Sequence, residues 1–181
     1  VYKRQTDDNV LRQTTARLPW LLIGMIGGIG NSMILGNFDA TFAAHPEMAL
    51  YIPLIGGTGG NVGTQSSAII VQGLANSSLD AKNTFKQVTK EAVVALINAT
   101  IISLLVYIYN FIRFGATATV TYSVSISLFA VVMFASIFGT LVPMTLEKLK
   151  VDPAIATGPF ISITNDIIGM MLYMGITVLL S

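Results

Sequence analysis

A single carboxylate stands in the last apolar stretch of the chain. Asp166 is the only charged residue between Pro153 and Ser181, and that stretch is long enough to cross a bilayer. A carboxylate at the centre of a membrane helix costs roughly 2.5 to 3.5 kcal/mol. Such a group is kept where it faces a partner, a cavity or a passing cation, and no basic residue lies inside any apolar stretch to pair with it. Asp166 is therefore predicted to belong to an ion pathway.

A second polar feature lies in the segment from Pro53 to Gln65. It holds five glycines together with Asn61 and Gln65. On a helix, several of its residues and one further amide fall roughly on one face: Gly57, Asn61, Gln65 and Gln72. Amides at this depth need partners or water, and glycines such as Gly60 expose backbone carbonyls as oxygen donors. This face is predicted to line an aqueous path.

The stretch that carries Asp166 shows the same pattern. Its small and polar residues are predicted to share one face, with Asn165 beside them: Gly158, Ser162, Asp166 and Gly169. The chain has no cysteine, and its single histidine lies in a predicted loop. Oxygen donors without thiolates favour Mg²⁺, Ca²⁺, Mn²⁺ or an alkali ion over Zn²⁺ or Cu⁺.

Composition sets the class of protein. Hydrophobic residues make up 53% of the 181 residues and charged residues 10%, whereas a soluble domain carries about 25% charged residues. The chain is predicted to be an all-α polytopic membrane protein. It has no nucleophile–base pair or zinc motif that would indicate an enzyme, and no feature that indicates a nucleic-acid site. It begins with Val, which indicates a natural or trimmed fragment.

Charged residues divide the chain into five apolar runs. These are Leu18 to Phe38, a part of Met48 to Leu79, Ala92 to Ile112, a part of Phe114 to Leu146, and Pro153 to Ser181. Each can supply the roughly 20 residues that a membrane span needs. Residues 1–17 are predicted to form a cytoplasmic connecting helix along the membrane surface, and residues 18–181 a five-helix transmembrane domain. An odd number of spans excludes a simple inverted repeat, so symmetry around a pore would come from a dimer.

Lysine and arginine give the predicted direction. If the spans alternate, nine of the ten basic residues fall on one side: Lys3, Arg4, Arg12, Arg17, Lys82, Lys86, Lys90, Lys148 and Lys150. The other side holds Arg113 with Asp39, His45 and Glu47. The positive side of a membrane protein is cytoplasmic. The chain is therefore predicted to be a multi-pass protein of the cell (inner) membrane, with its N-terminus in the cytoplasm and its C-terminus outside.

Glycines at four-residue spacing have a second interpretation. The pairs are Gly24/Gly28, Gly56/Gly60 and Gly59/Gly63. Such pairs commonly let two helices pack closely. The first pair is predicted to be a packing site. For the segment from Gly56 to Gly63, packing and a pore role both remain open at this point.

The residues described so far resemble the signature of the MgtE family of magnesium channels and transporters. The resemblance is carried by Pro53, Gly57, Gly60, Asn61, Gly63 and Gln65, followed by Gly73, Leu74 and Ala75. Gln72 stands where the family has arginine. The segment Ala16 to Trp20 looks like the start of the family's first span. Segments Val151 to Ala154 and Pro159 to Asp166 look like the start of its fifth span.

The resemblance implies a fold and a site. It implies a homodimer of five-span subunits, with a pore at or near the interface lined by the second and fifth spans. Asp166 from both subunits would hold a hydrated Mg²⁺, with Mn²⁺, Co²⁺ or Ca²⁺ as further candidate ions. Asp152 would bind a regulatory metal. Cytoplasmic N and CBS domains that close the pore are expected in the full-length protein and are absent from these 181 residues.

Two other functions fit some of these residues. A proton- or sodium-coupled secondary transporter of divalent cations would use Asp166 as a carrier that alternates between protonation states. A membrane scaffold without transport activity would use the glycines for packing alone, and it predicts no effect of Asp166 on ion flux. The function predicted from the sequence is passive, selective Mg²⁺ transport through a dimeric pore.

Overall fold

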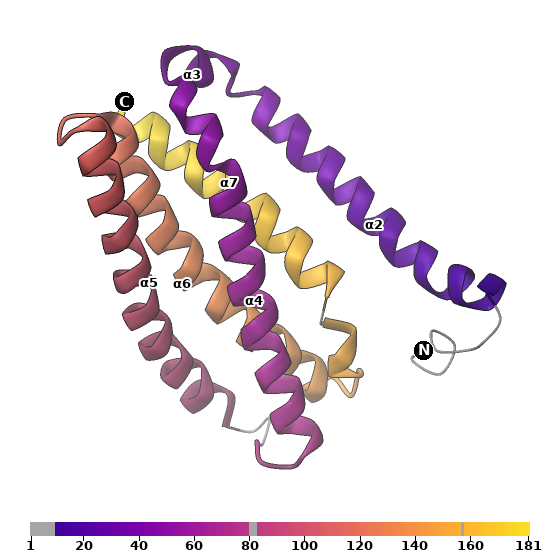
Figure 1. The fold of residues 1–181 in the computed structure, drawn as a ribbon. Helices are drawn as coiled ribbons and strands as arrows, with labels where there is room; N and C mark the ends of the chain where they lie inside the picture. The colour runs from indigo at the N-terminus through magenta and orange to yellow at the C-terminus, as the bar shows by residue number, and fades with distance from the viewer. Residues whose placement is uncertain (1–9, 80–82, 157) are drawn as a thin grey trace.

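The chain folds as a bundle of long helices. The computed structural model describes residues 10–79, 83–156 and 158–181, which form helices and short connections. The long helices run in alternating directions (Figure 1): α2 (Val10–Gly36), α4 (Ile52–Ala75), α5 (Thr84–Phe114), α6 (Thr119–Lys148) and α7 (Pro159–Leu180). Short helices complete the connections: α3 (Asp39–Ala44), η1 (Pro46–Tyr51) and η3 (Pro153–Ala156).

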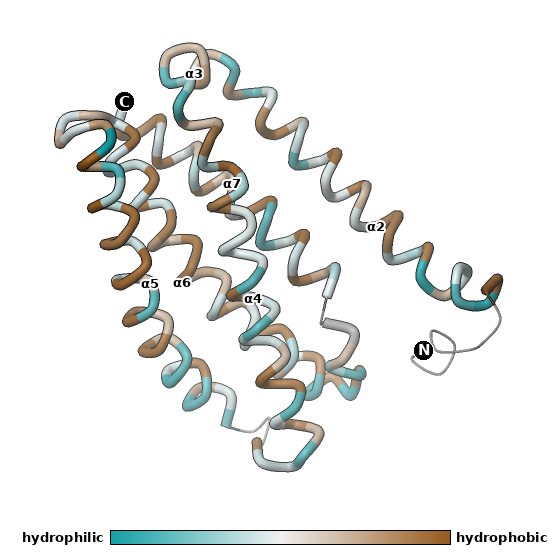
Figure 2. The backbone as a smooth tube through the Cα atoms, in the orientation of Figure 1, coloured by the Kyte–Doolittle hydropathy of each residue, from teal (hydrophilic) through white to brown (hydrophobic). Residues whose placement is uncertain are grey.

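The helices of this bundle have the length and hydropathy of membrane spans. Within the described ranges, four helices are long and apolar enough to cross a bilayer: α2, α5, α6 and α7. The fifth long helix, α4, has 24 residues but is rich in glycine and polar residues. Figure 2 shows apolar residues along the middle of α5 and hydrophilic ones at its lower end. The all-helical, polytopic class predicted from the sequence is confirmed.

Helix α6 forms the centre of the bundle. It carries more buried residues than any other described helix, and α4, α5 and α7 all pack against it. A cluster of buried apolar side chains joins α4, α6, α7 and η1 at one end: Met48, Tyr51, Ile55, Val120, Val124, Leu128, Val131, Met170, Tyr173 and Met174. At the same end, the Tyr51 hydroxyl donates to Asn110 Oδ1 at 2.5 Å. These contacts fix the point at which α4 begins.

Glycines bring α4 and α6 into close contact. A Cβ atom added to Gly139 of α6 would collide with the carbonyl oxygen of Gly63, and one added to Gly59 would lie 2.8 Å from Val131 Cγ1. Both positions need the absence of a side chain because backbone and branched atoms fill the space. The packing interpretation therefore holds for Gly59 and Gly63.

Replacing Gly139 with alanine is expected to destabilise the bundle by about 1–3 kcal/mol, the usual cost of overpacking a well-packed interior. The added methyl group meets the backbone of α4, which cannot rotate away as a side chain can. Thermal unfolding of the purified protein in detergent measures the effect. Gly175→Ala is the matched control, because an added Cβ there has no neighbour within 4 Å. Equal melting temperatures for the two variants would contradict the close contact.

Helix α2 stands apart from the other helices. None of its residues is buried, and its main packing partner is α7. The contact runs through Gly27, where a Cβ would collide with Ile163, whereas Gly24 and Gly28 face open space. The expectation that Gly24 and Gly28 pack a helix is thus not met within one subunit, because α7 contacts the face of α2 that carries Gly27, about 60° to 100° away from them.

The structure shows no helix break between residues 17 and 18. Helix α2 runs continuously from Val10, with Pro19 inside it. Residues 10–17 thus belong to the same helix as the predicted first span, and Thr14 and Thr15 donate to carbonyl oxygens of the preceding turn. Residues 1–9, with Lys3 and Arg4, lie outside the described residues, as does Lys82.

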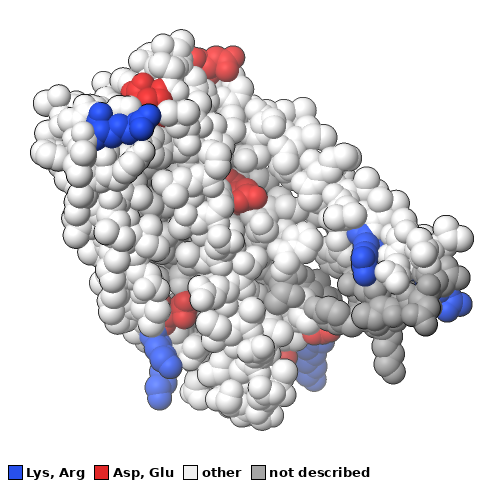
Figure 3. All heavy atoms as spheres, in the orientation of Figure 1, with Lys and Arg blue, Asp and Glu red and all other residues white. Residues whose placement is uncertain are grey.

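Charged side chains gather at the two ends of the bundle (Figure 3). The start of α2, the end of α4, the start of α5 and the end of α6 all lie at the lower end in Figure 1. The basic segments around Arg17, Lys86, Lys90 and Lys148 belong to these helix ends. Figure 3 also shows an acidic group half-way along the visible face, between the two ends.

Candidate functional site

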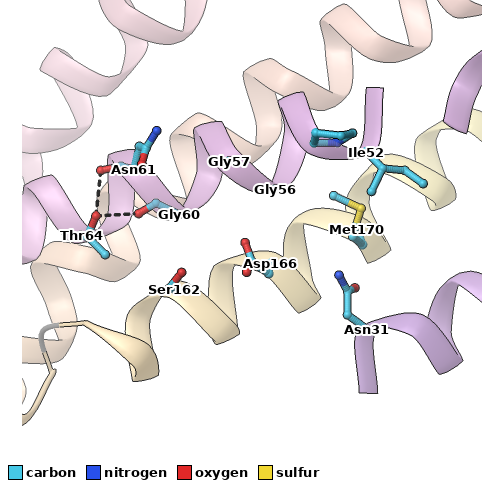
Figure 4. A pocket seen from close by; sticks show the side chains of 11 residues that line it. Asn31, Ile52, Gly56, Gly57, Gly60, Asn61, Thr64, Ser162, Asp166 and Met170 are labelled. Carbon is cyan, nitrogen blue, oxygen red and sulfur yellow. Dashed lines mark hydrogen bonds between the residues drawn. The ribbon is translucent and has the colours of Figure 1, made fainter. Parts of the chain in front are cut away.

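A polar cavity of about 400 Å³ opens between α2, α4 and α7 (Figure 4). Its lining comes from three helices: Asn31 of α2; Ile52, Pro53, Gly56, Gly57, Gly60, Asn61 and Thr64 of α4; and Ser162, Asp166 and Met170 of α7. Five of the residues predicted for the ion path meet here: Gly57, Gly60, Asn61, Ser162 and Asp166. Segments that are a hundred residues apart in the chain thus share one cavity.

Asp166 faces the glycines of α4. Ser162, Asp166 and Met170 follow one another at four-residue spacing, so they lie on the same face of α7. A Cβ added at Gly56 or at Gly60 would lie 3.6 Å from Asp166 Oδ1. The carboxylate thus lies at contact distance from the surface of α4 at these two glycines. Among the described residues, Asp166 has no hydrogen bond or ion pair, so its oxygens are available to an ion or to water.

The α4 wall of the cavity presents backbone and side-chain oxygens. Thr64 Oγ1 lies 2.8 Å from the Gly60 carbonyl oxygen, to which it donates, and 3.1 Å from that of Asn61. The single hydroxyl proton of Thr64 points back to its own helix, which leaves its lone pairs free to accept from water. Asn61 is exposed on the cavity surface. The polar part of this wall thus offers hydrogen-bonding groups without charge.

Four other residues predicted for the path lie elsewhere. Gln65 is exposed but does not line the cavity, and Gly158 precedes α7 with a φ of 82°, so it has no place on a helix face. Gly169 is buried against Val131 and Ile55. Asn165 is 1% exposed and is turned towards Gly63. The helical-face argument placed Gly158, Asn165 and Gly169 within about 100° of Asp166, which is too coarse to separate the cavity from the neighbouring helix.

Asn165 is a buried amide with unusual surroundings. Neither its Nδ2 nor its Oδ1 has a hydrogen-bond partner among the described residues. It fills the space that a side chain at Gly63 would need, next to the contact of α4 with α6. Its position shows that it packs between helices and does not line the cavity.

Asp152 does not line the cavity and lies in the turn before η3. It is exposed, and its Oδ1 accepts a hydrogen bond of 2.9 Å from the backbone N–H of Ala154. This bond caps the short η3 helix. The described residues contain no group of three or more His, Asp or Glu side chains that could hold a metal ion, either here or in the cavity.

Sequence reasoning missed two polar residues of the cavity, Asn31 and Thr64. Asn31 extends from α2 towards α7 (Figure 4), and its Oδ1 is buried without a hydrogen-bond partner in the described part of the chain. The sequence indicates Asn31 by the presence of an amide within a predicted apolar span. In that span, only the glycines were considered as candidate contact residues. Thr64 lies one turn after Gly60, so the polar face of α4 pointed to it.

The donors in this cavity suit a hard cation that keeps its water. One carboxylate, hydroxyl groups, amides and carbonyl oxygens can accept hydrogen bonds from coordinated water molecules. A single carboxylate does not replace a whole coordination shell, and Mg²⁺ gives up its water reluctantly. A polar cavity that holds a carboxylate, on the surface of a bundle of apolar helices, is typical of a membrane transport protein for cations.

Comparison with known proteins identifies the family. Residues 52–176 match the family model MgtE, described as a divalent cation transporter. The matched region runs from the start of α4 almost to the end of α7 and includes most of the residues that line the cavity. The chain belongs to the MgtE family.

Curated relatives agree with this assignment. The magnesium transporter MgtE of Bacillus subtilis is 34% identical over 160 residues, which are 88% of this chain and 35% of that protein. The magnesium transporter MgtE of Thermus thermophilus is 32% identical over 165 residues, 91% of this chain and 36% of that protein. The corresponding protein of Enterococcus faecalis is 28% identical over 172 residues. The chain thus spans about a third of the length of these relatives.

Proposed function

We propose that this chain forms the ion-conducting part of a passive, selective Mg²⁺ channel in the cell membrane. The observation that carries the proposal is the unpaired carboxylate of Asp166 in a polar cavity between α2, α4 and α7. Family membership supports the cation class, and the names of the relatives support magnesium as the transported ion. The ion is the substrate, and no enzymatic activity is proposed.

The complete pore is proposed to be a homodimer. One subunit offers one carboxylate and one side of a cavity that opens at its surface. A two-fold axis beside α4 and α7 would place a second Asp166 opposite the first. Two carboxylates balance the charge of one divalent ion, and together they accept hydrogen bonds from several of its water molecules. Lipid covers the apolar side chains left outside this interface, such as Leu104 and Leu105 of α5.

Selectivity is proposed to depend on the size of the hydrated ion. Mg²⁺ holds its water in a compact octahedral shell, whereas Ca²⁺ is larger and accepts irregular shells. Fixed acceptors on α4 and α7 would fit one shell size best. Transport needs no further energy source, because a membrane potential of about 100 mV contributes roughly 4.6 kcal/mol per divalent ion.

We also propose an orientation of the chain in the membrane and a regulatory metal site at Asp152. The N-terminus is proposed to be cytoplasmic, because the basic segments share one end of the bundle. Asp152, in the turn between α6 and α7, is then on the cytoplasmic side, where it is proposed to bind a regulatory metal together with a cytoplasmic domain. The additional length of the relatives is consistent with such domains.

Current measurements on this chain in planar bilayers test the proposed function. A passive Mg²⁺ channel gives currents that reverse at the Mg²⁺ equilibrium potential in symmetric pH and symmetric sodium. A reversal potential that follows a proton or sodium gradient would instead establish the coupled transporter. Absence of any flux from a well-folded dimer would favour a scaffold. Cross-linking across the two-fold axis, in the same preparation, reports whether the dimer is present.

A further inference from the structure

A second acidic side chain is half-buried among the helices, away from the cavity. Glu91 was placed just before the third predicted span, but it lies well inside α5, at the meeting point of α4, α5 and α6. Its Oε1 accepts a hydrogen bond of 2.7 Å from Ser66 of α4 and one of 2.5 Å from Ser136 of α6. One carboxylate oxygen thus joins three helices.

The two serines depend on Glu91 for their hydrogen bonds. Each hydroxyl has one proton, so donation to Glu91 uses both donors, and the 3.2 Å contact between Ser66 and Ser136 adds no simultaneous third bond. Ser66 is 5% exposed and Ser136 is 2% exposed. Loss of the acceptor would leave two buried hydroxyl groups dependent on each other, which is unfavourable in an apolar interior.

Ser66, which donates to Glu91, lies on the face of α4 that is opposite the cavity. Each residue of an α-helix is rotated by about 100° from the one before, so Ser66 lies about 180° from Gly57 and about 200° from Thr64. Glu91 therefore holds α4 from the side opposite the cavity. Ser136 lies one turn before Gly139, where α6 touches the backbone of Gly63. The hydrogen bonds and the close contact both act on the same part of α4.

We propose that Glu91 is a positioning residue for the ion path. Through Ser66 and Ser136 it fixes the rotation of α4, so that Gly57, Gly60 and Thr64 face Asp166. Glu91 does not line the cavity and does not contact the ion. The role in transport rests on the function proposed above, whereas the role in fixing α4 is independent of it.

A disulfide between α4 and α7 can report the rotation of α4 directly. The chain has no cysteine, so two introduced ones are the only thiols. A Cβ at Gly60 would lie 3.3 Å from Ser162 Oγ, which puts the pair Gly60→Cys and Ser162→Cys within disulfide reach. The rate of oxidative cross-linking is measured in this background with Glu91→Ala, with Glu91→Gln and with Glu147→Ala. Glu147 is the control, because it is an exposed acid near the end of α6.

Mg²⁺ flux is measured in parallel, with the same three substitutions in the chain without cysteines. Glu91→Ala is expected to slow cross-linking and to reduce flux by about tenfold each, because the hydroxyl groups of Ser66 and Ser136 lose their shared acceptor. Glu91→Gln is expected to preserve both, since its amide oxygen accepts from both serines. Glu147→Ala is expected to change neither. Elution of each variant as a dimer of normal size shows that it has folded.

Three results would overturn the proposal. Normal cross-linking in Glu91→Ala would show that α4 does not need the carboxylate. Slow cross-linking with normal flux would show that the position of α4 does not matter for transport. Failure of Glu91→Gln alongside Glu91→Ala would show that the charge acts in another way. If the unsubstituted chain cross-links but carries no Mg²⁺, the proposed function fails, and cross-linking alone decides whether Glu91 positions α4.

Discussion

Replacing Asp166 with alanine is expected to lower Mg²⁺ flux by about tenfold to a hundredfold, the loss that corresponds to one or two charge-assisted hydrogen bonds. The carboxylate has no partner among the described residues, so its removal takes a ligand of the hydrated ion and leaves the packing intact. The substitution is present in both subunits, so a dimeric pore loses both negative charges. Mg²⁺ uptake into liposomes with an entrapped fluorescent indicator measures it.

The substitution Asp166→Asn tests the effect of the negative charge separately from the size of the side chain. The amide keeps the size of the side chain and removes the negative charge, so it is expected to lose most of the flux as well. Asp39→Ala is the control, because Asp39 is an exposed acid at the start of α3, away from the cavity. If Asp166→Asn transports Mg²⁺ at the normal rate, the ion does not depend on this carboxylate.

Replacing Gly57 with leucine is expected to block the path while the subunit still folds. An added Cβ at Gly57 has no neighbour within 4 Å, and the residue lines the cavity, so the new side chain points into the space proposed for water. An apolar group there displaces ordered water without replacing its hydrogen bonds. A reduction in flux of at least about tenfold is expected, comparable with the loss of one well-placed hydrogen bond to a charged group.

Gly175→Leu is the matched control for this substitution. Gly175 also has free space around an added Cβ, but it lies nine residues after Asp166, on the opposite face of α7. Its flux is expected to remain normal. Asn61→Leu tests the same wall of the cavity and is expected to behave like Gly57→Leu. Normal conduction by both cavity variants would exclude α4 from the ion path.

Much of this architecture could be predicted from the sequence. The low fraction of charged residues defined the class, and the charged boundaries located each long helix, although the starts of α2 and α5 lie eight residues before the predicted ones. Helical spacing placed Gly57 and Asn61 on one face of α4, and Asp166 was predicted to face the same path because a carboxylate in apolar surroundings has few alternatives. The MgtE assignment from the glycine-rich motif was confirmed by the family model.

The remaining positions depended on tertiary contacts that a sequence pattern does not contain. Asn165 and Asp166 are adjacent, and both are polar, yet one is buried against Gly63 and the other faces the cavity. The two side chains point in directions that differ by about 100° around α7. Which of them faces the cavity depends on the helices that pack against α7. Glu91 was read as a boundary of a span because it is charged, although its partners Ser66 and Ser136 come from two other helices.

The attachment of α2 to the bundle has a consequence for how a signal could reach the ion. Helix α2 contributes no buried residue, and its close contact is Gly27 against Ile163 of α7, three residues before Asp166. The wall formed by α4 is held by the glycine contact with α6 and by the hydrogen bond from Ser66 to Glu91 of α5. A force on the N-terminal end of α2 is therefore transmitted mainly to α7, and we expect the carboxylate of Asp166 to move while α4 stays in place.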